Sequence, residues 1–128
     1  MNIKKEIEIC YQLDGSCAKT AVEISRKVLG YKSGSCLNKG SVASFEFASI
    51  VGKLFPNHKI IAYCSKEVSN NIGQKNVKYG GTLIKFDPNP CIWLFAYHLE
   101  NDDKGHMVIG FPVAYGNTVI NAAYKIFI

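Results

Sequence analysis

The first half of the chain carries apolar residues at helical spacing. In residues 17–29 they recur every three or four positions, which predicts an amphipathic helix that Gly30 can end. A second helix is predicted over 41–54. Ser41 is its candidate cap, and Pro56 follows it in the segment that breaks the helix.

The second half of the chain is dominated by strand patterns. Residues 91–99 (CIWLFAYHL) form a nearly continuous apolar run, which predicts a central strand of a sheet. The shorter predicted elements are a strand or extended arm over 2–11, a short helix over 65–72, a strand or helix over 82–86, and strands over 58–64, 106–111, 118–123 and 124–128. Helices followed by an antiparallel sheet indicate the α+β class. The length of 128 residues fits a single domain, 1–128.

Composition and charge fit an ordinary globular domain and do not favour nucleic-acid binding. Hydrophobic residues make up 48% of the chain, enough for one ordinary core. The net charge is +5, but the basic residues are scattered, so we expect no nucleic-acid partner. A small basic module that binds nucleic acid stays open as an alternative, and salt-dependent binding would identify it.

No apolar run approaches the roughly 20 residues of a membrane span, and the start lacks the apolar core of a secretory signal. We therefore expect a cytoplasmic protein without a membrane segment, which works in its own cell or in another cell that receives it. The chain has five cysteines, an odd number, at irregular spacings. Because no two of them form a CxxC pair, a structural zinc site is not favoured. We expect no metal and no cofactor.

The candidate chemistry centres on Cys17, which follows a turn and begins the first predicted helix. A thiol must lose its proton to become a good nucleophile, and a helix N-terminus stabilises the thiolate. His106, at the start of a downstream strand, can take that proton. Asn121 can orient the imidazole from the next strand, because the two residues would flank one hairpin. The side-chain amide of Gln12, with the Cys17 backbone N–H, can form an oxyanion hole.

Several segments resemble the papain-like cysteine peptidases, most of all the bacterial type that removes bacteriocin leaders after a double glycine. These segments are QLDGSCAKTA (12–21), PCIWL (90–94), GHMVIGF (105–111) and GNTVIN (116–121). The resemblance implies a papain-like fold and hydrolysis of a peptide or protein substrate, without a cofactor. It also implies a role for each matched residue: Cys17 is the nucleophile, His106 the general base and acid, Asn121 the orienter and Gln12 the oxyanion donor.

Other readings of the residues remain open. The chain could be a catalytically silent papain-like domain that binds a protein partner, or a thiol acyltransferase or deamidase, because fold and triad do not fix the acceptor. Some residues compete with the assigned ones: Cys36 as nucleophile, His58 and His98 as base, and Asp102 and Asp103 as orienter. Trp93, Phe95 and Tyr97 alternate along one strand and are expected to share one face.

Overall fold

The computed structural model describes residues 7–10, 17–32, 41–102, 104–112 and 117–128. Their elements, in chain order, are β1 (Glu8–Cys10), α1 (Cys17–Val28), β2 (Ser41–Ala43), α2 (Ser44–Leu54), β3 (Ile60–Tyr63), α3 (Lys66–Ser69), β4 (Val77–Gly81), β5 (Cys91–Leu99), β6 (His106–Ile109) and β7 (Thr118–Phe127).

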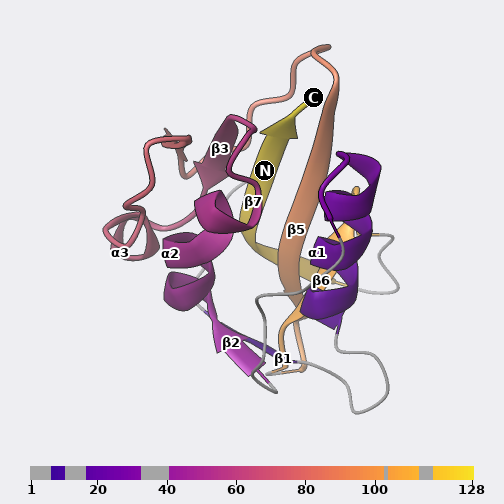
Figure 1. The fold of residues 1–128 in the computed structure, drawn as a ribbon. Coiled ribbons are helices and arrows are strands. Elements are labelled where there is room, and N and C mark those ends of the chain that lie inside the picture. The colour runs from indigo at the N-terminus through magenta and orange to yellow at the C-terminus, as the bar shows by residue number, and fades with distance from the viewer. Residues whose placement is uncertain (1–6, 11–16, 33–40, 103, 113–116) are drawn as a thin grey trace.

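The described chain is α+β, as the sequence predicts, with its helices N-terminal to most of the sheet (Figure 1). Five strands form a sheet in the order β4-β3-β7-β5-β6, and every neighbouring pair is antiparallel except β3–β4. A separate two-stranded ribbon joins β1 to β2. A parallel bridge between Ile9 and Gly105 connects this ribbon to the start of β6.

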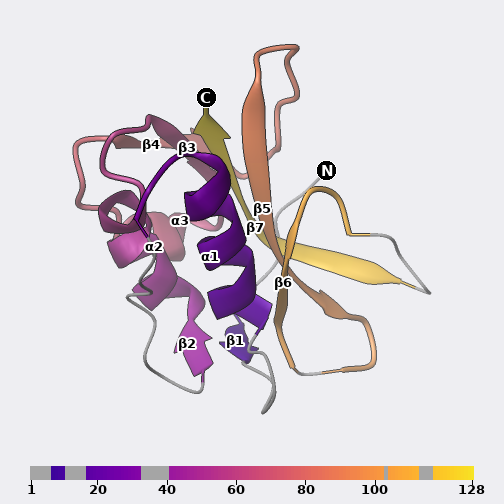
Figure 2. The same cartoon turned by 45° about the vertical axis from the view of Figure 1, so that its right-hand side comes forward.

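Helices α1 and α2 cover one face of the sheet, which Figure 2 shows from the side. Ala18 and Val22 of α1 and Phe47 of α2 are buried in one core together with alternate sheet residues such as Ala96 and Tyr124. The opposite face carries a second, smaller cluster built on Phe95, Tyr63 and Ile120. The alternation of strand side chains between the two faces therefore decides which residues lie beneath α1.

Four expectations about the elements are corrected. Residues 118–127 form one long strand, β7, which pairs with both β3 and β5 and takes the centre of the sheet. Strand β5 consequently lies between β6 and β7, and the expected hairpin joining those two strands is not formed. Residues 41–43 form β2, so Ser41 begins a strand and not a helix.

The fourth correction concerns residues 77–86. The structure has a strand over Val77–Gly81 and none of the expected regular structure over 82–86, apart from an isolated bridge residue. Strand β4 pairs in parallel with β3. Its sequence, VKYGG, has little apolar alternation, so its pairing with β3 and not its own pattern makes it a strand.

The β5–β7 pairing contains a bulge beside the candidate site. Ala96 pairs with Ala122 and Tyr97 with Ile120, which leaves Asn121 as the extra residue on β7. A bulge changes the direction of a side chain on the bulged strand. This irregularity determines which residue Asn121 meets.

Candidate active site

Cys17 is the first residue of α1, as the sequence predicts. The apolar positions of the helix place Ala18, Ala21 and Val22 in the core, and Cys17 packs at the margin of that core while half-buried. Its thiol is therefore partly open to solvent and lies at the positive end of a 12-residue helix. This is the setting in which a thiolate is stabilised.

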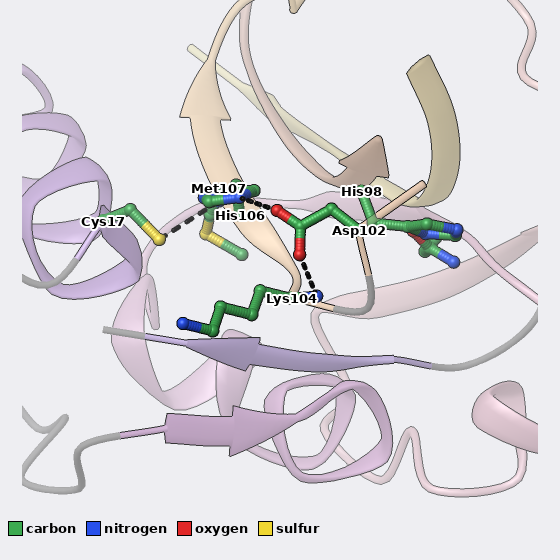
Figure 3. A network of polar contacts seen from close by, with 7 residues as sticks. Cys17, His98, Asp102, Lys104, His106 and Met107 are labelled. Carbon is green, nitrogen blue, oxygen red and sulfur yellow. Dashed lines mark hydrogen bonds and ion pairs between the residues drawn. The ribbon is translucent and has the colours of Figure 1, made fainter. Parts of the chain in front are cut away.

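The sulfur of Cys17 contacts the outermost strand of the sheet, β6. The backbone N–H of Met107 in β6 donates to Cys17 Sγ at 3.4 Å (Figure 3). Strand β6 is an edge strand, bonded to β5 on its other side, so this N–H points away from the sheet toward α1. A donor of this kind favours the charged form of the acceptor it meets. His106 directly precedes Met107 on the same strand, so this contact lies one residue along the chain from the predicted base.

His106 begins β6 as expected and is about one-quarter exposed (24%). Its register partner is Tyr97, whose ring centroid lies 5.6 Å from the centroid of the imidazole. Met107 alternates to the other side and is buried in the core beneath α1. The two residues at the start of β6 thus have different roles. Met107 packs in the core and donates its backbone N–H, and His106 supplies an ionisable ring.

The imidazole of His106 faces a carboxylate from the loop that precedes it. His106 Nε2 lies 3.8 Å from Asp102 Oδ2, and Figure 3 shows Asp102 on the side of His106 away from Cys17. Asp102 was one of the two rival orienters in the sequence; the other, Asp103, lies outside the described residues.

Asn121 has a different partner from the one predicted for it. Nδ1 of His98 lies 2.8 Å from Oδ1 of Asn121, so the ring donates to the amide oxygen, and both side chains are buried. His98 follows Ala96 by two residues on β5, and alternation therefore places it on the helix-covered face. The structure brings Asn121 to His98, and brings Asp102 to His106.

The remaining candidates lie elsewhere. Gln12 and Cys36 fall outside the described residues, so the oxyanion donor and the rival nucleophile have no structural description. His58 lies near the C-terminal end of α2, where its Nδ1 is 2.5 Å from the hydroxyl of Tyr31. Trp93, Phe95 and Tyr97 share the face opposite the helices, as expected.

Burial separates Cys17 from two other described cysteines. Burial raises the pKa of the Cys64 thiol to about 12. It also raises the pKa of Cys91, although nearby Lys125 acts in the opposite direction. Cys91 begins strand β5. Cys64 directly precedes Ser65, the N-cap of the one-turn helix α3, but its burial opposes ionisation. Cys17 is the described cysteine whose surroundings suit a nucleophile.

Within the described parts of the chain, no group of three or more His, Cys, Asp or Glu side chains is arranged to hold a metal ion. None of the helices in those parts is long and apolar enough to cross a membrane.

Comparison with protein-family models, with curated proteins and with solved structures gives no match.

Proposed function

We propose that this domain is a thiol hydrolase of the papain-like cysteine peptidase type, acting on a peptide or protein substrate. The observation that carries the proposal is the position of Cys17 Sγ. It lies at the N-terminus of α1 and 3.4 Å from the Met107 backbone nitrogen, one residue from His106. Catalytic hydrogen bonds are commonly loose without substrate and tighten when it binds. The resemblance of the flanking motifs to that family supports the same assignment.

The proposed reaction has two stages. The thiol proton moves to His106, and the sulfur attacks the carbonyl carbon of the scissile amide. The carbon–nitrogen bond then breaks as His106 returns the proton to the departing amine, leaving a thioester on Cys17. Water attacks that thioester, His106 accepts a proton from the water, and the carbon–sulfur bond breaks as the thiol is restored. The backbone N–H groups at the start of α1, with the Gln12 amide, would stabilise the oxyanion.

The first test is selective alkylation. We expect iodoacetamide at about pH 5.5 to modify Cys17 about tenfold faster than Cys91, because only a stabilised thiolate persists in acid. Replacing His106→Ala should remove that preference, since the thiolate loses its imidazolium partner. His58→Ala is the matched control, because His58 is a half-buried histidine that contacts Tyr31 instead of the Cys17 region. Mass spectrometry of the digested protein gives the rate at each cysteine.

A second candidate is a catalytically silent papain-like domain that binds a protein partner. The buried hydrogen bond of Asn121 with His98 favours it, because the residue in the expected orienter position is engaged elsewhere. Slow labelling in acid, equal at Cys17 and Cys91 and unaffected by His106→Ala, would reject the enzyme and support this candidate. An active nucleophile that transfers the acyl group to an amine instead of water would instead indicate an acyltransferase.

A further inference from the structure

We infer that Asp102 is the positioning residue for His106, an inference that rests on the proposed function of Cys17 and His106. The inference is based on the distance of 3.8 Å between Asp102 Oδ2 and His106 Nε2. Asp102 lies in the loop that connects β5 to β6 (Figure 3). The residue supplied by the motifs for this role, Asn121, is hydrogen-bonded to His98 instead.

The carboxylate of Asp102 is held in place by its own loop. Its Oδ1 accepts a hydrogen bond from the backbone N–H of Lys104 at 3.0 Å, and its backbone N–H donates to the Leu99 carbonyl at 2.9 Å. One carboxylate oxygen is thus fixed by the loop while the other faces the imidazole. The group is organised before any charge develops on His106, which is what a positioning residue requires.

The strand order explains why Asp102, and not Asn121, lies beside the imidazole of His106. Strand β5 separates β6 from β7, so a β7 side chain meets β5 before it can meet β6. The bulge at Asn121 directs that amide to His98, the nearest imidazole on β5. Asp102 lies four residues before His106 on the connection that leads into β6, so it reaches the ring without crossing a strand.

This arrangement assigns the two ring nitrogens. With Nε2 facing the carboxylate, Nε2 keeps its proton and Nδ1 is the nitrogen that receives the proton of Cys17. Ionisable groups in contact with the ring include Asp102, at 3.8 Å, and Tyr97, whose ring centroid is 5.6 Å away. Figure 3 draws Cys17, His98 and Lys104 in the same region. The Asp102 carboxylate is 43% exposed, so its attraction for an imidazolium is screened by salt.

The test compares Asp102→Asn, Asp102→Glu and Asn121→Ser by the rate of Cys17 alkylation from about pH 5 to pH 9. We expect Asp102→Asn to slow labelling about tenfold near pH 5.5 and to leave it unchanged near pH 9, where thiolate forms without help. Asp102→Glu should recover part of the acid rate. Asn121→Ser should keep the wild-type profile. Protection of buried Cys64 in each variant reports that the fold is intact.

The outcomes separate this inference from the proposed function. If Asp102→Asn keeps the wild-type rate of Cys17 alkylation near pH 5.5, or if only Asn121→Ser lowers that rate, Asp102 does not position His106. Either result leaves the assignment of Cys17 as nucleophile intact. A rate of Cys17 alkylation that does not change in His106→Ala would overturn both this inference and the proposed function.

The wild-type protein gives an independent test if Asp102→Asn unfolds. Alkylation of Cys17 in the wild type near pH 5.5 should slow about threefold from low to high salt, because salt screens the attraction between Asp102 and the imidazolium. A rate that does not depend on salt overturns the inference.

Discussion

At the scale of single residues, burial decides which thiols can react. Cys64 is fully buried, and burial raises its pKa to about 12, so its thiolate is negligible at neutral pH. We expect native protein near pH 8 to leave Cys64 unmodified by iodoacetamide, and protein unfolded in urea to be alkylated there at the rate of an ordinary thiol. Mass spectrometry before and after unfolding measures both. Native modification of Cys64 as fast as that of half-exposed Cys91 would contradict the expectation.

The residues of the site differ in how far the sequence predicts them. Cys17 and His106 are found at the starts of a helix and a strand, because local turn signals and periodicity mark those positions. The partners of the two histidines are not predictable in this way. They depend on strand order and on one bulge residue, Asn121, which no local pattern reveals. The sequence offers His98 only as a rival base, whereas in the structure it is buried and hydrogen-bonded to Asn121.

At the scale of elements, prediction succeeds where burial and periodicity agree. Strand β5 has the predicted bounds, 91–99, because its apolar run leaves no alternative to a buried strand. Strand β6 ends at Ile109, two residues earlier than predicted, and Gly110 follows with φ +80°, in the left-handed region that glycine favours. The sequence predicts residues 41–43 as the first turn of α2, because only the pairing of β2 with β1 distinguishes a strand from a helix there.

Helix α2 contains a glycine that close packing requires. A Cβ on Gly52 would lie 2.5 Å from Gln74 Cβ and 2.6 Å from Asn76 Oδ1. The Asn76 amide donates to the carbonyls of Gly52 and Phe55 at the end of α2, so this segment cannot retreat without losing those bonds. We expect Gly52→Ala to lower the free energy of unfolding by about 1–3 kcal/mol through overpacking, despite the better helix propensity of alanine.

Urea unfolding measures that change. Gly73→Ala is the matched control, because a Cβ there would meet no heavy atom within 4 Å, and its unfolding free energy should stay close to that of the wild type. A stabilised Gly52→Ala would show that helix propensity outweighs the contact with Gln74 and Asn76.

At the scale of the whole molecule, the two faces of the sheet are closed differently. Helices α1 and α2 close one face, while the other carries a group of aromatic rings that includes Trp93, Phe95, Phe86 and Phe111. Phe86 belongs to the connection before β5, and the next residue, Asp87, forms an ion pair with Lys125 of the central strand β7. The pair therefore fastens this connection to the middle of the sheet.

Lys125 is fully buried, its ammonium lying 5.9 Å from the Trp93 ring centroid and 4.8 Å from that of Phe127. The hydrogen bond from Lys125 is the main cause that holds the pKa of Asp87 below its ordinary value of 3.8. A carboxyl group whose pKa is lower in the folded state stabilises the fold above its unfolded pKa and loses that contribution as pH falls through the folded one.

The stability that Asp87 contributes should therefore be complete at pH 7 and disappear in acid below about pH 3.8. We expect Asp87→Asn to be less stable than wild type at pH 7, because it leaves a buried ammonium without its carboxylate, and to converge with wild type as the pH approaches 2. Urea midpoints across this range measure the difference, and Glu23→Gln on the exposed side of α1 controls for loss of a negative charge alone. A difference between Asp87→Asn and wild type that is constant with pH would mean that the ion pair does not hold the connection to the sheet.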